Sequence, residues 1–231
     1  MAKDLRSLAD PDKALELARF FKTAPGDYGY GDKFLGITVP QTRKIAKKYQ
    51  ALELKEIEKL LDSKFHEFRF CGLVIITLQF KKAQVSAKQA QLFNFYIRQA
   101  KKGRINNWDL VDVTAPIMGR YLFNEPDSLN FLSNLAASRS LWLRRISLLL
   151  TFAFIREGEF EPTLIISKQL LKDKHDLIHK AVGWALREVG NRNKKILIKF
   201  LSIHSKNMNR TTLRYSIEKF SENERKYWLK K

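Results

Sequence analysis

Trp108 and Asp112 are the residues of this sequence whose types and spacing are best suited to chemistry. They lie four residues apart in the segment N-N-W-D-L-V-D, so a helix would place both side chains on one face. The face of an indole attracts cations, and a carboxylate stabilises positive charge that develops on a neighbouring group. A carboxylate here is unexpected, because the chain has a formal net charge of +19. The pair therefore predicts a site that binds a cation or a cationic transition state.

A second tryptophan and an arginine could complete such a site. Trp184 follows Lys180 by four residues in H-K-A-V-G-W-A-L-R-E, and Arg145 lies in L-W-L-R-R between the two tryptophan segments. A guanidinium can hold a phosphate, and a nearby carboxylate can stabilise an oxocarbenium ion at a sugar. Each tryptophan alone is more often a core aromatic, and Asp112 could equally be a surface carboxylate or a partner of Arg145. The combination indicates a site more specifically than its parts do.

The composition indicates a folded protein that binds a polyanion. Of 231 residues, 45% are hydrophobic and 29% are charged, and Lys and Arg outnumber Asp and Glu by 43 to 24. Such an excess favours nucleic acid, whose phosphates release counterions on binding, over a membrane surface or a basic enzyme without a polyanionic partner. The segment 187–231 contains 13 Lys and Arg against 4 Asp and Glu, which predicts a basic clamp in the last fifth of the chain.

Helical patterns dominate the chain and no segment alternates with the period of a strand, so an all-α fold is predicted. Asp10 and Pro11 are typical of the start of a helix, which is expected to end near Lys22. Pro40 opens the next helix after a glycine-rich loop at 24–39. Further helices are expected at about 53–62, 64–81, 86–102, 106–122, 126–136, 139–157, 160–172, 174–190, 192–203, 209–219 and 221–230.

An internal repeat organises these helices. Similar segments place a charged residue near a helix start, at spacings of 43, 33, 35 and 34 residues, and the anchors are Arg69, Asp112, Arg145, Lys180 and Arg214. Two helices per unit at this length are typical of HEAT-like repeats. We therefore predict one domain over residues 1–231, a HEAT-like superhelix whose inner helices line a concave basic groove. The alternative is that these charges are solvated or lie at the edge of the core, and that only the chosen register aligns them.

The chain resembles the AlkD-like family of DNA alkylation-repair glycosylases, which are HEAT-like all-helical proteins. The resemblance extends from about Phe20 to Glu218 and rests on G-D-K-F-L-G-I-T-V-P-Q-T-R-K, N-N-W-D-L-V-D, L-W-L-R-R and H-K-A-V-G-W-A-L-R-E. It implies hydrolysis of the N-glycosidic bond of cationic N3- and N7-alkylated purines in double-stranded DNA, as part of base excision repair. Some relatives keep the fold without glycosylase activity, so the alternative is a non-catalytic binder of distorted or branched DNA.

The same resemblance implies roles for individual residues. Asp112 resembles the catalytic aspartate of the family, Trp108 and Trp184 resemble its aromatic site residues, and Arg145 resembles its DNA-contacting arginine. With the repeat register and the basic segments added, the residues expected to contact DNA are Arg145, Lys180, Arg214, Arg187, Arg69, Lys33 and Arg43. Lys33 and Arg43 are equally compatible with a solvated surface.

No metal and no cofactor are predicted. His175 and His179 lie four residues apart but lack a third ligand, so they are expected to be ordinary histidines of a helix face. Cys71 is the single cysteine and is expected to be buried, which excludes an intramolecular disulfide and fits a reducing cytosol. The first residues lack the apolar segment of a signal peptide, so a cytoplasmic, nucleoid-associated protein is expected. Nothing in the sequence suggests an oligomer, and a monomer is expected.

Overall fold

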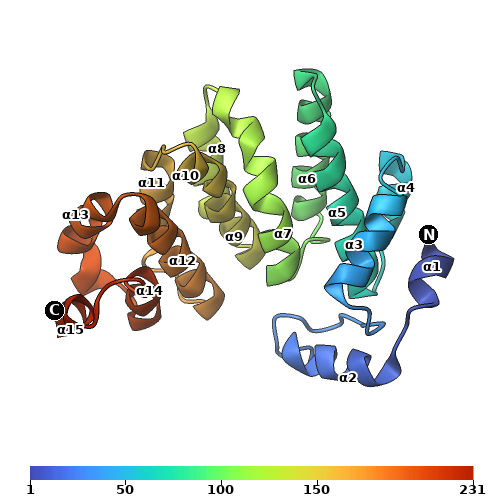
Figure 1. Ribbon diagram of the computed structural model, residues 1–231, viewed down its shortest axis with the longest axis horizontal. Coiled ribbons are helices and arrows are strands. Elements are labelled where there is room, and N and C mark those ends of the chain that lie inside the picture. The colour runs from blue at the N-terminus through green and yellow to red at the C-terminus, as the bar shows by residue number, and fades with distance from the viewer. Residues whose placement is uncertain (231) are drawn as a thin grey trace. The chain divides into compact units, whose positions relative to one another are not determined.

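The computed structural model describes residues 1–230 and consists of helices joined by loops (Figure 1). Within this range no strand is formed, and an isolated parallel bridge joins Lys33 and Phe65. None of the described helices is both long and apolar enough to cross a membrane. The protein thus has the all-α helical-repeat fold that the sequence predicts.

The chain divides into two compact units, Met1–Thr114 (unit 1) and Ala115–Lys231 (unit 2), and the boundary falls within one helix, α7. The helices in chain order are α1 (Ala2–Arg6), α2 (Pro11–Phe20), α3 (Val39–Lys48), α4 (Leu54–Leu61), α5 (His66–Lys82), α6 (Ser86–Lys101), α7 (Trp108–Met118), η1 (Gly119–Asn124), α8 (Ser128–Ala136), α9 (Leu141–Leu150), α10 (Phe152–Arg156), α11 (Glu161–Leu170), α12 (Asp176–Arg192), α13 (Lys194–His204), η2 (Ser205–Asn207), α14 (Arg210–Ser216) and α15 (Glu222–Lys230). Unit 1 therefore carries Trp108 and Asp112, and unit 2 carries Arg145 and Trp184.

Helix α5 is the central helix of unit 1 and packs against α3, α4 and α6 (Figure 1). Its residues 66–77 are all buried, because neighbouring helices cover every side of its apolar sequence. Gly72 lets α4 approach closely, since a Cβ at this position would lie 3.3 Å from the Cβ of Leu60. The charged residues in the first turn of α5 are consequently enclosed by the core.

Helix α12 is the central helix of unit 2 and packs against α9, α11, α13 and α14. It meets α14 closely at Gly183, where a Cβ would lie 2.4 Å from the Cβ of Tyr215 and 2.7 Å from the carbonyl oxygen of Thr212. The pairs α8/α9 and α11/α12 each pack together, and α9 packs on α12. This stacking of helix pairs is typical of HEAT-like repeats.

Three elements differ from the sequence prediction. The single helix expected at 139–157 is wrong, because α9 and α10 are separated at Thr151, whose hydroxyl donates to the carbonyl oxygen three residues earlier (2.6 Å). The helix expected at 106–122 changes to the 3-10 helix η1 after Met118, two residues beyond Pro116, which cannot donate a backbone hydrogen bond. Helix α1 was not predicted, since five residues are too few to show a helical period.

Candidate functional site

Helix α7 carries Trp108 at its first position and Asp112 one turn later. The side chain of the fully buried Asn107 accepts a hydrogen bond from the backbone N–H of Trp108 (2.8 Å). Asp109 accepts one from the N–H of Leu110 (2.8 Å), and its negative charge is favourable at a helix N-terminus. These bonds satisfy amide groups that a helix start leaves without partners. The residues on either side of Trp108 therefore fix the position at which α7 begins, with Trp108 as its first residue.

The indole of Trp108 belongs to a group of aromatic rings at the C-terminal end of α2. It stacks on Phe21, with ring centroids 5.3 Å apart, and meets the edge of Phe20 at 5.9 Å. Phe21 is buried, whereas 63% of Phe20 is exposed. The half-buried indole and the exposed phenyl ring together present an aromatic surface on which a planar or cationic group can stack.

Asp112 is half-buried and lies near a fully buried phenol. Burial raises the pKa of Tyr96, the negative charge of Asp112 raises it further, and a hydrogen bond with the hydroxyl of Thr114 (3.1 Å) opposes both effects. The carboxylate of Asp112 is therefore close enough to Tyr96 for its charge to act on the phenol. A carboxylate that is partly removed from water acts more strongly on a nearby cation than one in bulk water.

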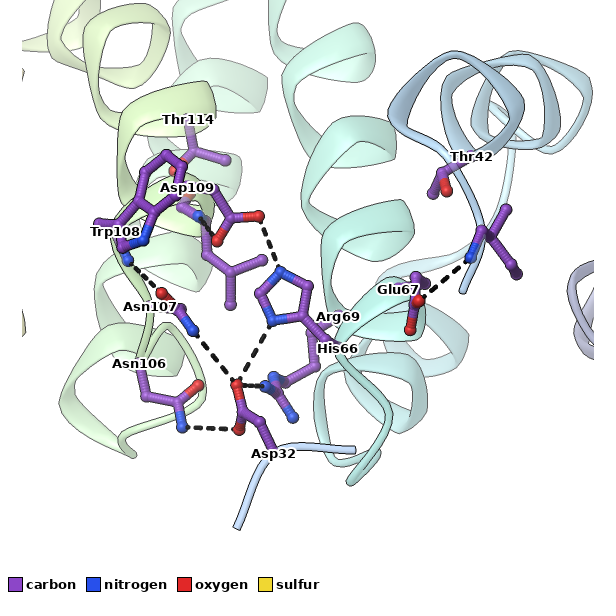
Figure 2. A network of polar contacts seen from close by, with 12 residues as sticks. Asp32, Thr42, His66, Glu67, Arg69, Asn106, Asn107, Trp108, Asp109 and Thr114 are labelled. Carbon is purple, nitrogen blue, oxygen red and sulfur yellow. Dashed lines mark hydrogen bonds and ion pairs between the residues drawn. The ribbon is translucent and has the colours of Figure 1, made fainter. Parts of the chain in front are cut away.

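A buried polar network lies beside the start of α7 (Figure 2). Nε2 of His66 is 2.7 Å from Oδ2 of Asp109, and Nδ1 is 3.4 Å from Oδ2 of Asp32. Nη2 of Arg69 is 2.7 Å from the same Asp32 oxygen. The side-chain amide of Asn107 also donates to Asp32 (3.5 Å). The network therefore connects the glycine-rich loop, α5 and the first turn of α7.

The charges of this network balance. Burial lowers the pKa of His66, but its hydrogen bonds and charge interactions with Asp109 and Asp32 outweigh this and raise the pKa to about 9. Burial raises the pKa of Asp32, but the hydrogen bond from His66 and the charge of Arg69 outweigh this and lower it. At neutral pH two cations thus face two carboxylates, which is how buried charges are tolerated.

Glu67 holds the C-terminal part of the glycine-rich loop at 24–39. Its buried carboxylate accepts hydrogen bonds from the backbone N–H groups of Leu35 (2.9 Å), Gly36 (2.9 Å) and Ile37 (3.3 Å). Gly36 has a φ of +82°, and a Cβ there would lie 2.0 Å from the carbonyl oxygen of Asp10, so only glycine fits. The motif G-D-K-F-L-G-I-T-V thus has a structural basis in unit 1.

An apolar cavity of about 200 Å³ lies next to this network. Phe21, Phe34 and Phe70 line it together with residues of α2 and α3, and His66 and Asp109 reach it from the network. Phe21 thus contacts both the cavity and the indole of Trp108.

The cations of unit 1 that were expected to contact DNA differ in exposure. Lys33 and Arg43 are exposed. Arg69 is only 4% exposed, pairs with Asp32 and donates to the carbonyl oxygen of Ser63 (2.8 Å). This placement matches the alternative in which the repeat anchor at Arg69 is a core-edge charge. A contact between Arg69 and DNA stays a prediction.

Trp184 lies on α12 of unit 2 and is half-buried. The ring of Phe152 meets it edge to face with centroids 4.7 Å apart. Its indole N–H donates to Oε1 of Glu188 (3.1 Å), which follows one turn later. The polar edge of the indole is therefore held by Glu188, and one edge contact with Phe152 fixes the ring further.

The basic residues predicted in unit 2 include both paired and exposed side chains. Arg145 is 5% exposed, and its Nη1 donates to the carbonyl oxygen of Leu177 (2.6 Å), which ties α9 to the start of α12. Lys180 forms a partly exposed ion pair with Asp176 (2.7 Å). The other two are Arg187, which pairs with Glu218, and Arg214, which is exposed.

The two histidines at the start of α12, the N-cap His175 and His179, have local partners. Nδ1 of His175 accepts a hydrogen bond from the backbone N–H of Leu177 (3.1 Å), which caps the helix. Nε2 of His179 lies 2.6 Å from the carbonyl oxygen of Asp173. Within residues 1–230, no group of three or more His, Cys, Asp or Glu side chains is placed to hold a metal ion.

The network around His66 was not predicted from the sequence. Two signals pointed to it: W-D-L-V-D contains a second carboxylate, Asp109, and F-H-E-F-R places a histidine, a glutamate and an arginine in one helical turn. Neither signal says that these segments meet, because their contacts bridge more than 30 residues of sequence. Spacing along one helix predicts only neighbours three or four residues apart.

Comparisons with known proteins agree with this architecture. The family model described as "DNA alkylation repair enzyme" matches residues 1–220, and a search of curated proteins gave no match. Among solved structures, the chain is similar to one described as "Predicted DNA alkylation repair enzyme from Enterococcus faecalis". That similarity has a TM-score of 0.72 at 15% identity and covers 93% of this chain and 97% of the other, which shows a shared fold. Because the family match spans nearly the whole sequence, this chain belongs to the DNA alkylation repair enzymes, the AlkD-like family.

Proposed function

We propose that this protein is a DNA N-glycosylase that releases cationic N3- and N7-alkylated purines from double-stranded DNA and leaves an abasic site. The observation that carries the proposal is the half-buried carboxylate of Asp112, one helical turn from the indole of Trp108, in a chain of net charge +19. Membership of the family supports a role in the repair of alkylated DNA. The excess of positive charge supports DNA as the partner.

The chemistry needs few protein groups, because the substrate is already activated. Alkylation at N3 or N7 makes the purine a cation, so it leaves as a neutral base with the electrons of the C1′–N bond and needs no general acid. The remaining sugar has oxocarbenium character, which a carboxylate stabilises. Water then forms a bond to C1′ and gives up a proton. In this proposal Asp112 stabilises the cationic sugar and orients that water.

The tryptophans are assigned to recognition of the lesion. Trp108 and Trp184 are each proposed as an aromatic contact for the cationic nucleotide, because a cation over an indole face gains about 0.5–2 kcal/mol. A neutral purine lacks that gain, so the rings would favour alkylated over normal bases. Trp184 is suited to this role because Phe152 and Glu188 hold its ring in place.

The basic residues are assigned to the DNA backbone. Arg145 would anchor a phosphate, and the exposed or partly exposed cations proposed to assist are Lys33, Arg43, Lys180, Arg187 and Arg214. Each phosphate contact lowers the affinity as salt increases, so binding should weaken steeply with ionic strength. A single HEAT-like domain over residues 1–231 that acts as a monomer with a concave basic groove is part of the same proposal.

The decisive experiment is release of 7-methylguanine and 3-methyladenine from methylated duplex DNA by the parent protein and by Asp112→Asn. The parent protein is expected to release both bases. The variant is expected to lose most base release and to keep its affinity for DNA, because the amide has nearly the same shape without the charge. Equal loss of binding and base release would contradict the role of Asp112.

A second outcome would favour the other class of function. If the parent protein binds DNA in a salt-sensitive manner and releases no alkylated base, it is a non-catalytic binder of distorted or branched DNA. A matched variant, Asp127→Asn, controls for the loss of one negative charge at an exposed position. It should behave as the parent protein does in both assays.

A further inference from the structure

We propose that His66 is a positioning residue that holds Trp108 in the orientation needed to receive an alkylated nucleotide. This inference rests on the proposed function of the site. It deepens that proposal by assigning a role to a buried group that the glycosylase chemistry does not use. His66 acts through Asp109, Asp32 and Phe21 and does not itself touch DNA.

The first support is that both sequence neighbours of Trp108 are tied to the same histidine-centred network (Figure 2). Asp109, which follows Trp108, lies 2.7 Å from Nε2 of His66. Asn107, which precedes Trp108, donates to Asp32, and the same carboxylate oxygen lies 3.4 Å from Nδ1 of His66. The backbone of Trp108 is therefore held on both sides.

The second support is an unbroken series of ring contacts from His66 through Phe21 to Trp108. The imidazole packs on Phe21 with centroids 4.9 Å apart, and Phe21 stacks on the indole at 5.3 Å. Phe34 stacks on both the imidazole of His66 and the ring of Phe21, with ring centroids 4.8 Å and 5.1 Å apart, respectively. A displacement of the imidazole would therefore shift the ring on which Trp108 lies.

The third support is the charge of the network. The groups that face His66 are Asp32 from the loop, Arg69 from its own helix and Asp109 from α7. When His66 loses its proton, two largely buried carboxylates are left with one cation, Arg69. One of the two carboxylates must then move or take up water, because an uncompensated buried charge is costly. Asp109 is 14% exposed and Asp32 is 4% exposed at the side chain, so Asp109 is the one free to turn outward.

Fluorine NMR of the full-length protein can test this directly. The chain contains four tryptophans, and 5-fluorotryptophan gives each a resonance that a Trp108→Phe variant assigns to Trp108. In the parent protein, the Trp108 resonance is expected to shift with a midpoint near the pKa of His66, about 9. The Trp184 resonance serves as an internal reference, because its ring contacts Phe152 and Glu188.

Variants distinguish positioning from general loss of structure. His66→Gln should abolish the titration of the Trp108 resonance, and Asp109→Asn should move its midpoint to lower pH, because the Asp109 charge no longer raises the pKa of His66. Both variants should slow single-turnover release of 3-methyladenine at pH 7.5 by about 10- to 100-fold, as a misplaced recognition group does, and leave affinity for undamaged DNA unchanged. His204→Gln, in which another histidine packed on a phenylalanine is replaced, is the matched control.

The outcomes separate this inference from the proposed function. A Trp108 resonance that does not respond to pH, together with normal base release by His66→Gln, would overturn the positioning role and leave the glycosylase proposal intact. A pH-dependent Trp108 resonance in a protein that releases no base would uphold the link between His66 and Trp108 and refute the glycosylase activity. If His66→Gln does not fold, Asp109→Asn carries the test, because Asp109 is the most exposed carboxylate of the network.

Discussion

The imidazole of His66 and the carboxylate of Asp109 meet at 2.7 Å between α5 and α7, immediately beside Trp108. The contact joins the most enclosed helix of unit 1 to the helix that carries the proposed catalytic aspartate. It also explains why W-D-L-V-D contains two aspartates. Asp109 is held by a buried cation, whereas Asp112, one turn from Trp108, is the one assigned to chemistry.

The first prediction is a loss of stability at alkaline pH. Folding raises the pKa of His66 from 6.5 to about 9, because the hydrogen bonds with Asp109 and Asp32 outweigh burial. Its contribution to the free energy of unfolding is therefore complete below pH 6.5 and is lost as the pH rises through about 9. We expect a decline on the order of 3 kcal/mol, because one pKa unit corresponds to about 1.4 kcal/mol.

Urea unfolding at several pH values between neutrality and mildly alkaline conditions measures this decline. His66→Gln should be less stable than the parent protein at neutral pH and should lack the decline. His204→Gln should retain it. A parent protein whose stability is flat across this range would show that His66 is not charged in the folded state.

The second prediction concerns Glu67. Replacement by Gln removes the negative charge of the carboxylate, which accepts hydrogen bonds from three backbone N–H groups. Loss of these charge-assisted hydrogen bonds should lower the free energy of unfolding by about 2–3 kcal/mol. Hydrogen exchange should also become faster at the amides of Leu35, Gly36 and Ile37, which donate to this carboxylate. Glu56→Gln is the control, because Glu56 forms only an exposed ion pair with Lys59 and such pairs contribute little. Unchanged exchange at these three amides would show that the charge of Glu67 does not hold this segment of backbone.

Much of the fold could be predicted from the sequence, because the start and the apolar period of most helices are visible in short stretches of sequence. Asp10 and Pro11 indicate the start of α2, and Asp10 indeed accepts a hydrogen bond from the N–H of Lys13 (3.1 Å). The interruption at Thr151 could not be predicted in the same way. Apolar residues continue on both sides of it, and a threonine within a helix shows no sign in sequence of where its hydroxyl points.

The candidate site was predictable only in part, for a related physical reason. Trp108 and Asp112 share a helix face, so their relation follows from a spacing of four. His66, Asp32 and Arg69 are brought to that helix by packing between distant segments. A single sequence also does not reveal that Arg69 is enclosed, because the same arginine would suit an exposed phosphate contact.

The third prediction tests the packing of unit 2. A Cβ at Gly183 would lie 2.4 Å from the Cβ of Tyr215 and 2.7 Å from a backbone oxygen of α14, so neither obstacle can rotate away. Gly183→Ala should therefore destabilise the protein by at least about 1–3 kcal/mol. At Gly190 the nearest obstacle is the end of the Leu197 side chain at 2.4 Å, which can change rotamer. Gly190→Ala should therefore lower the free energy of unfolding less than Gly183→Ala does. Chemical denaturation of the two variants measures both losses, and an equal or larger loss for Gly190→Ala would contradict the prediction.

The fourth prediction uses two equally exposed apolar residues on α2. Phe20 is 63% exposed and lies against Trp108, and Leu15 is 64% exposed five residues earlier on the same helix. If the aromatic surface of Trp108 and Phe20 receives a nucleotide, Phe20→Ala should weaken binding of alkylated DNA, because stacking of a base on an aromatic ring contributes about 1–3 kcal/mol. Phe20→Tyr should retain most of the affinity, since the ring is kept.

Leu15→Ala is the matched control for this prediction, because it removes a similar exposed apolar area from the same helix without removing a ring. Binding of duplexes that contain a stable cationic purine analogue measures the effect, with undamaged duplex for comparison. We expect a selective loss for Phe20→Ala and none for Leu15→Ala. An equal loss for both would mean that α2 contributes general apolar surface, and no loss for either would place the lesion away from the ring of Phe20.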